Sequence, residues 1–364
     1  MMRLNWISNF FPLPRYLTMQ AAGLDISDLS LKYVKLGRKD KNIYLQNFGK
    51  KSIPEDLIES GEIKDKEKLT DLLRSVQKDT GLRYIIVSLP EEKGFLGKTK
   101  IPKIKREEIR DTIELQIEEL IPLPAKDVIF DFDIIEGIDK KDDDHIDIMF
   151  VAFPRKIVED YRDVLINAGF MPLIFEMEAH AFKRCVVSKE DMDTQIIVDL
   201  GKTRTTLIIV NNNIIQFTTT FNVAGDNINN ILSKNLSVST DEAEKIVKEN
   251  GFVKSKSNEA VFNSLLPVVS AIKDEISRSI IFWDNHPDWH NKDQKKISKI
   301  ILCGGISNMK GLPQYLSYEL KVPVAKANPW INITSLDNYV PTLELSESLT
   351  YTTPLGLALR IFDY

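Results

Sequence analysis

Two short polar turns, each at the end of an apolar run, carry the residues of this chain best suited to bind a phosphorylated ligand. The turns hold Asp25, Ser27 and Ser30 in the first case, and Asp199, Gly201, Thr203 and Thr205 in the second. Tight turns of this kind direct backbone N–H groups and hydroxyls toward an anion. A carboxylate would repel phosphate directly, so the natural role of Asp25 and Asp199 is to hold Mg²⁺ through water. Two opposed turns therefore fit a magnesium-bound triphosphate.

Either turn alone has a simpler explanation, because Asp often bonds its own backbone in a hairpin. The ligand interpretation is favoured because the pattern recurs: the segment GLDISDLSLKYVKL near the start has a counterpart, QIIVDLGKTRTTLIIV, about half the chain later. Both segments give a strand, an Asp, a turn rich in small or hydroxyl-bearing residues, and a second strand. A long-period repeat of this kind predicts a duplicated α/β domain, with one turn from each copy facing a shared cleft.

Two further segments fit the same ligand less specifically. Gly304 and Gly305 follow the apolar run IILC, so a backbone without side chains could approach a ring or a ribose there. In DEAEKIVKENG, Glu244 and Lys248 share one helical face. Taken alone, that spacing is better explained by an ion pair on a solvated helix.

Hydrophobic periodicity predicts the elements that must position these turns. We expect strands near residues 24–26, 29–33, 84–89, 128–135 and 146–153, and helices near 64–79, 107–120, 158–168 and 178–187. The charged run KKDDD between the fourth and fifth of these strands predicts an exposed hairpin turn.

The composition excludes several classes of protein. The chain has 364 residues, 43% apolar and 28% charged, which suits a globular protein of two lobes. No stretch approaches the roughly 18 consecutive apolar residues of a membrane helix. With 48 basic against 53 acidic residues there is no broad basic stripe, so nucleic acid is not an expected partner. Only Cys185 and Cys303 are present, which favours a reducing compartment and hence the cytoplasm.

Two other segments allow more than one interpretation. Residues 1–20 hold Trp6, Phe10 and Phe11 but no continuous apolar core of a signal peptide, so we expect an arm packed on the body. A short segment lying on a membrane surface is the alternative. His286 and His290 would share a helical face as metal ligands, but Pro287 lies between them and favours a connecting loop.

Taken in this order, the turns, the Gly-Gly segment and the polar helix resemble the superfamily of actin, heat-shock chaperones and sugar kinases. Within it the chain is similar to the PilM family of type IV pilus assembly, with the FtsA family of cell division as the nearest alternative. The resemblance covers Gly23 to Gly356 and rests on the opening GLDIS and SLKYVKL and on four later segments. These are IELQIEELIPLP running into DFDII, YRDVLINAGFMPL, AEKIVKENG and CGGISNMKGLPQYL.

The resemblance implies a two-lobed actin-like α/β fold with an extra small subdomain of the FtsA type, and a site for ATP and Mg. It adds Lys32 to the first turn, and it assigns Gly225, Glu244, Lys245, Lys248, Gly304, Gly305 and Asn308 to the nucleotide site. A carboxylate near the attacking water would be Glu176 or Glu178, between which the sequence does not decide. Asp25 and Asp199 would hold the Mg through water.

Departures from the family pattern bear on catalysis more than on binding. Ser27 stands at the usual glycine of the first turn, Ala224 at the first glycine of the pair 224–225, and Val247 where the FtsA type has lysine. We therefore expect a nucleotide-binding scaffold with at most slow ATP hydrolysis.

The implied organisation is an N-terminal arm followed by two discontinuous lobes with insertions. The expected parts are 1–20, the arm; 21–80 and 156–190, the first lobe; 81–155, an inserted interaction subdomain; 191–230 and 297–364, the second lobe; and 231–296, its helical subdomain. The resemblance implies a cytoplasmic protein at the inner face of the inner membrane that binds the cytoplasmic tail of PilN, a bitopic membrane protein. Pilus motor ATPases and the membrane platform protein would be further partners.

Two other functions share this fold. A small-metabolite kinase would need a base aspartate at a second substrate site, and no segment marks one. An FtsA-like division protein would end in a basic amphipathic membrane helix, whereas this chain ends LGLALRIFDY with Arg360 as its only cation.

Overall fold

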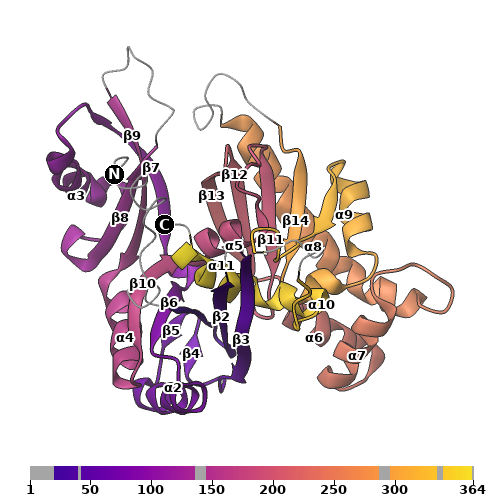
Figure 1. Ribbon diagram of the computed structural model, residues 1–364. Helices are drawn as coiled ribbons and strands as arrows, with labels where there is room; N and C mark the ends of the chain where they lie inside the picture. The colour runs from indigo at the N-terminus through magenta and orange to yellow at the C-terminus, as the bar shows by residue number, and fades with distance from the viewer. Residues whose placement is uncertain (1–19, 40–41, 136–144, 287–295, 334–338, 363–364) are drawn as a thin grey trace.

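The computed structural model describes the chain apart from residues 1–19, 40–41, 136–144, 287–295, 334–338 and 363–364. Two lobes stand side by side, each built on a five-stranded sheet, and a smaller sheet extends from the first lobe (Figure 1). The expected N-terminal arm, the KKDDD turn and His290 lie outside the described residues, so the expectations for them stay open.

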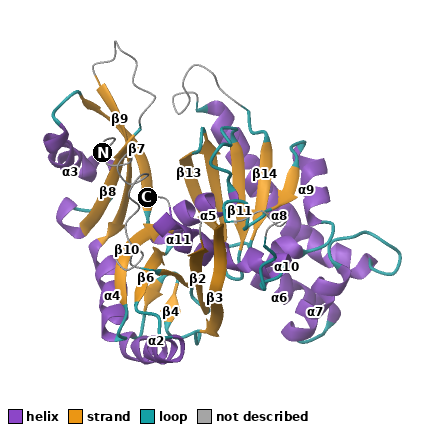
Figure 2. Ribbon diagram, in the orientation of Figure 1, coloured by secondary structure: helices purple, strands orange, loops and turns teal. Residues whose placement is uncertain are grey.

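The first lobe is a mixed sheet with helices on its faces (Figure 2). Its elements are β1 (Ala22–Ile26), β2 (Ser30–Lys39), β3 (Asn42–Ser52), the short pair β4 (Ile58–Glu59) and β5 (Glu62–Ile63), β6 (Tyr84–Leu89), β10 (Met171–Met177), α2 (Lys66–Thr80), α4 (Arg155–Asn167) and α5 (Glu178–Val186). The sheet order is β10-β6-β1-β2-β3, in which β1, β2 and β3 are antiparallel neighbours while β1, β6 and β10 run parallel.

The second lobe repeats this pattern. Its elements are β11 (Gln195–Leu200), β12 (Thr205–Asn211), β13 (Ile214–Phe221), β14 (Lys299–Cys303), β15 (Val324–Lys326), α6 (Gly225–Leu236), α7 (Thr240–Asn250), α8 (Glu259–Asn285) and α9 (Leu312–Leu320). Strands β11, β12 and β13 are antiparallel neighbours, and β11, β14 and β15 run parallel. The repeat seen in the sequence is therefore a repeat of topology, which confirms the prediction of two related lobes.

A small unit is inserted after β6. It consists of β7 (Phe95–Pro102), α3 (Ile109–Leu120), β8 (Val128–Ile134) and β9 (His145–Pro154), in the sheet order β7-β9-β8. Ile109, Ile113 and Ile117 of α3 are buried on this sheet and form a core separate from that of either lobe. The insert was expected at residues 81–155, a range that includes β6. Strand β6 instead pairs with β1 and β10 in the first-lobe sheet, where its run YIIVSL is almost wholly buried.

The C-terminal region divides between the lobes. Strands β14 and β15 belong to the second-lobe sheet, whereas helix α11 (Thr352–Leu359) packs on α5 and β1 of the first lobe (Figure 1). The segment 297–364 expected in the second lobe is thus split between the two lobes.

Helix α11 comes so close to α5 that glycine is required at position 356, since a Cβ atom on Gly356 would lie 1.9 Å from the carbonyl oxygen of Ala181.

Most expected helices and strands are confirmed to within three residues at each end, because their apolar period matches the face that they bury. The lobes also share apolar packing, since the buried cluster of the first lobe continues to Ile197 and Ile208 on one face of the second-lobe sheet. Within the described ranges no helix combines the length and apolar character needed to cross a bilayer.

Candidate functional site

The first turn connects β1 to β2 and is held by its own serines. Ser27 donates its backbone N–H to the carbonyl of Ser30 at 2.9 Å, and the two hydroxyl oxygens lie 3.1 Å apart. Asp25, which is 5% exposed, accepts a hydrogen bond from the Ser88 hydroxyl of β6 at 3.1 Å. Lys32 is its cross-strand partner on β2. The turn therefore presents two hydroxyls, a carboxylate and a cation.

The second turn connects β11 to β12 in the equivalent position. Gly201 donates its N–H to the carbonyl of Arg204 at 3.1 Å, and Gly225 at the start of α6 donates to the carbonyl of Gly201 at 3.1 Å. Thr205 is fully buried and donates its hydroxyl to the carbonyl of Val223 at 2.6 Å. Of the two predicted threonines, Thr205 fastens the turn to the strand end, while Thr203 in the turn retains partial exposure.

The charge of Lys32 acts on three carboxyl groups, those of Asp25, Asp199 and Glu178. Burial raises the pKa of Asp199 to about 7 and that of Asp25 above its ordinary value, and it outweighs the lowering by the lysine. The pKa of Glu178 is also raised, first by burial and then by the charges of Asp25, Glu91 and Asp199, with Lys32 opposing them. Such a surplus of negative charge around one lysine fits a site that takes a cation.

Glu176 and Glu178 differ sharply in their surroundings. Glu176 is 8% exposed and pairs with Arg184 at 2.6 Å and with Arg360 at 2.9 Å, so both carboxylate oxygens are engaged. Glu178 is the first residue of α5, and the charge of Asp25 acts on its carboxyl group. Glu176 thus ties β10 to α5 and the C-terminal segment, while Glu178 is the carboxylate placed at the site between the lobes.

Glu91 belongs to the same group of carboxyls, although no motif in the sequence marks it. It lies in the single turn η2 (Glu91–Lys93) after β6, is 3% exposed, and accepts the backbone N–H of Ala179 at 3.0 Å. Its Oε1 atom is buried and, in the structure, has no hydrogen-bond partner. Burial raises the pKa of Glu91 to about 7, with the Ala179 amide and the Thr218 hydroxyl opposing the shift. We refer to Asp25, Lys32, Glu91, Glu178 and Asp199 as the interlobe site.

The Gly-Gly segment borders this site directly. Gly304 has a φ of 79°, and a Cβ atom there would lie 2.8 Å from a carboxylate oxygen of Asp199. A Cβ on Gly305 would meet only Thr350, at 3.6 Å, so space remains beside it. Asn308 instead donates its amide to the carbonyl of Ser346 at 2.6 Å, which fastens the loop to the segment before α11.

Helix α7 contributes a more exposed group. Glu244 and Lys248 form an ion pair at 2.6 Å with side chains 52% and 72% exposed, and Lys245 is exposed beside them. The charges of this helix also act on Lys50 of β3 in the first lobe. The pKa of Lys50 is lowered by burial and then by Lys32, Lys202 and Lys248, and Glu244 raises it. No motif marks Lys50, which pairs across the strands with Lys32. Like charges directly opposite in a sheet are unfavourable, so this pair fits a polyanionic ligand.

The residues present fit Mg²⁺ held through water. Among the described residues no three His, Cys, Asp or Glu side chains are close enough together to ligate a metal ion directly. Carboxylates beside turn amides and lysine are the donor set that a hydrated Mg²⁺ bound to phosphate oxygens prefers. Asp25 and Asp199 would hold such an ion in its outer shell.

Comparison with known proteins places this geometry in a family. The family model for type IV pilus assembly protein PilM matches residues 23–362, nearly the whole chain. A solved structure of a PilM-PilN type IV pilus biogenesis complex superimposes with a TM-score of 0.77 at 20% identity, over 94% of this chain and 99% of that one.

More distant structures share the fold. MreB5 of Spiroplasma citri bound to AMPPNP aligns with a TM-score of 0.54 at 14% identity, over 95% of this chain and 96% of that one. The ethanolamine utilization protein EutJ of Carboxydothermus hydrogenoformans aligns with a TM-score of 0.53 at 14% identity, over 98% and 97% of the two chains. The expected actin-like fold is thereby confirmed, and the match of the family model shows that the chain belongs to the PilM family of type IV pilus assembly proteins.

Proposed function

We propose that this chain binds Mg-ATP between its lobes and acts as a cytoplasmic scaffold of the pilus assembly platform, at the inner face of the inner membrane. The observation that carries the nucleotide part is a pair of topologically equivalent turns whose buried carboxyls, Asp25 and Asp199, are both influenced by the charge of Lys32. Each turn would supply N–H and hydroxyl donors to phosphate oxygens, and Lys32 would add a positive charge. The metal would neutralise phosphate charge between Asp25 and Asp199.

Binding is better supported than rapid hydrolysis. Glu178 would be the carboxylate that accepts a proton from water, since the charges of Asp25 and Asp199 both act on it at the start of α5. Both serines of the first turn, however, are engaged with each other, and Thr205 bonds the backbone. We therefore propose slow turnover, with nucleotide serving mainly to stabilise one arrangement of the lobes.

The partner we propose is the cytoplasmic tail of a PilN-type membrane protein, as in the PilM-PilN complex to which this chain is similar. The inserted unit, β7 to β9 with α3, is the candidate docking region because it folds on a core of its own and presents sheet edges at β7 and β8. Motor ATPases and the platform protein would be further partners. An FtsA-like division role is the second candidate for this fold.

Hydrogen exchange of the full chain tests the partner. A synthetic peptide of the PilN cytoplasmic tail from the same organism is expected to slow amide exchange in residues 95–135 and 145–154 and to bind with micromolar affinity in fluorescence anisotropy. A peptide of the same composition in scrambled order is the control. Protection confined to the helices α6 to α9, or equal binding of both peptides, would contradict this docking region.

A further inference from the structure

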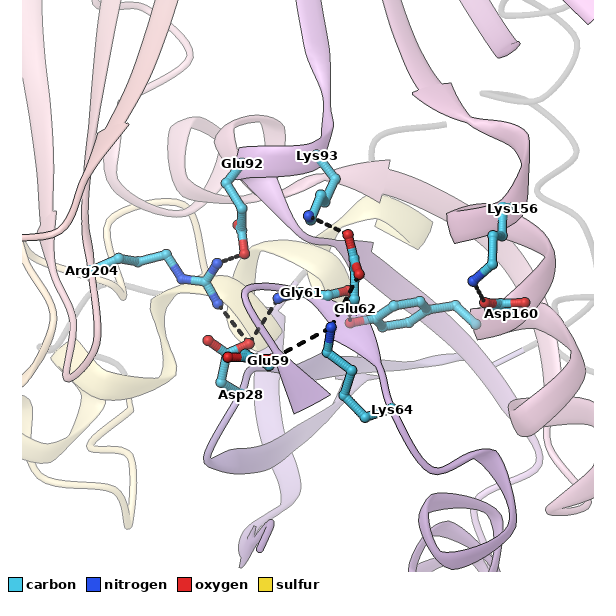
Figure 3. A network of polar contacts seen from close by, with 11 residues as sticks. Asp28, Glu59, Gly61, Glu62, Lys64, Glu92, Lys93, Lys156, Asp160 and Arg204 are labelled. Atoms are coloured by element: carbon cyan, nitrogen blue, oxygen red, sulfur yellow. Dashed lines mark hydrogen bonds and ion pairs between the residues drawn. The ribbon is translucent and has the colours of Figure 1, made fainter. Parts of the chain in front are cut away.

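One arginine joins the two turns across the lobes (Figure 3). Arg204, the last residue of the second turn, places a guanidinium nitrogen 3.2 Å from Oδ1 of Asp28 in the first turn and pairs through another with Glu92 in η2. The three side chains are only 15%, 14% and 18% exposed, respectively. Ion pairs this sheltered from solvent are much less screened than surface pairs. We call Arg204, Asp28 and Glu92 the interlobe ion-pair cluster.

The two carboxylates are themselves held by rigid parts of the first lobe. Asp28 accepts the backbone N–H of Gly61 at 3.0 Å, and the carbonyl of Gly61 accepts the hydroxyl of the buried Tyr161 at 3.2 Å. Glu92 lies in η2 beside Glu91, and Glu91 accepts the backbone N–H of Ala179 in α5. Arg204 therefore contacts two fixed positions of the first lobe at once, and the distance between the turns depends on that contact.

Removing the guanidinium would leave two sheltered carboxylates facing each other with no cation between them. That loss is more costly than losing an exposed pair, because the remaining charges are desolvated and repel. The apolar packing that includes Ile197 and Ile208 would stay in place. The lobes would then separate at the turns while remaining joined along that packing.

We propose that Arg204 is the positioning residue of the nucleotide site: with Asp28 and Glu92 it sets the spacing of the two phosphate turns before the nucleotide arrives. The inference rests on the proposed nucleotide function, since a ligand that needs both turns binds only the closed arrangement. If the closed arrangement becomes a minor state, the apparent dissociation constant rises in inverse proportion to its population. A direct phosphate contact by Arg204 is the competing role, and it predicts no change of lobe spacing in the free protein.

Two measurements on the full chain separate these roles. Spin labels at K78C on α2 and E259C on α8, both exposed positions, report the distance between the lobes without nucleotide, and both native cysteines are buried. We expect Arg204→Ala to lengthen or broaden this distance distribution and to weaken Mg-ADP and Mg-ATP by the same factor of about 10. Arg204→Lys keeps a positive charge between Asp28 and Glu92 and leaves the Asp28–Gly61 hydrogen bond in place, so it is expected to fall between wild type and Arg204→Ala in both measurements.

Arg278→Ala is the matched control, because Arg278 pairs within α8 with Glu275, and its side chain is 71% exposed. An unchanged distance distribution in Arg204→Ala would overturn the positioning role. Loss of affinity for Mg-ATP but not for Mg-ADP would also overturn it, as would equal effects of Arg204→Lys and Arg204→Ala on the spacing. A wild-type chain that binds neither nucleotide would contradict the proposed function instead, and the distance measurement would still decide the role of Arg204 in lobe closure.

Discussion

Replacing Glu91 with glutamine is expected to make the protein more stable at pH 8 and to leave its stability nearly unchanged near pH 4.5. Glu91 is 3% exposed, and burial raises its pKa from an ordinary value of 4.5 to about 7. Between these values the folded state holds a proton that the unfolded state has lost. The unfolding free energy of the wild type therefore falls as the pH rises through this window.

The size of the effect follows from the shift. At about 1.4 kcal/mol for each unit of pKa difference, this shift lowers the unfolding free energy by about 3 kcal/mol once the pH exceeds the folded pKa. Glutamine keeps an acceptor for the Ala179 N–H but carries no charge, so the unfolding free energy of the variant does not fall with the ionisation of residue 91. Urea unfolding followed by circular dichroism at pH 4.5 and pH 8 measures it. Glu119→Gln, at an exposed position of α3, is the control.

Other carboxyls also titrate in this range, so the difference between variant and wild type is the decisive quantity. Asp199 in particular has a pKa of about 7 and will contribute its own fall in stability. Parallel stability curves for Glu91→Gln and wild type across pH 5 to 8 would show that Glu91 is ionised and solvated in the native state, contrary to its place in the interlobe site.

Lys32→Met is expected to weaken Mg-ATP binding by about 10- to 100-fold, as loss of one charge-assisted hydrogen bond to phosphate implies. The charge of Lys32 opposes the effect of burial on the pKa of Asp25, Glu178 and Asp199. Its loss therefore also leaves these carboxyls less ionised at neutral pH and less able to hold Mg²⁺. Methionine retains the length and apolar stem of the side chain.

Calorimetric titration measures this loss, and Lys39→Met is its control because Lys39 is an exposed lysine at the far end of the same strand. If Lys32→Met and Lys39→Met bind Mg-ATP equally well, Lys32 is an ordinary strand lysine and the site must lie elsewhere.

Much of the fold follows from local patterns. The recurrence around Asp25 and Asp199 predicted two lobes because strand, turn and strand are short-range features, and the topology repeats them in the same order. The place of α11 did not follow, since LGLALRIF shows a buried helix but not the sheet that buries it. Its partners on β1 and α5 are more than 160 residues away in sequence.

In the site, too, local patterns were predictable and long-range packing was not. Glu176 and Glu178 stood equal in the sequence because they are near neighbours and no spacing fixes the position of an attacking water. The strand in fact ends at Met177 and α5 begins at Glu178, so the chain turns between them and the two carboxylates diverge. No motif marked Glu91, and Arg204 was given no role although it lies in the second turn. Their partners Ala179 and Asp28 are brought to them only by the packing of distant segments.

The most direct test of nucleotide binding between the lobes is calorimetric titration of the full chain with ATP, in Mg²⁺ and in EDTA, beside Asp199→Asn. We expect wild-type binding that depends on Mg²⁺, weakening of at least about 10-fold in the variant, and little continuing heat from turnover. Equal affinity for ATP with and without Mg²⁺, or in wild type and Asp199→Asn, would contradict the assignment of Asp199 to the metal. No binding in the wild type under either condition would contradict the nucleotide site itself.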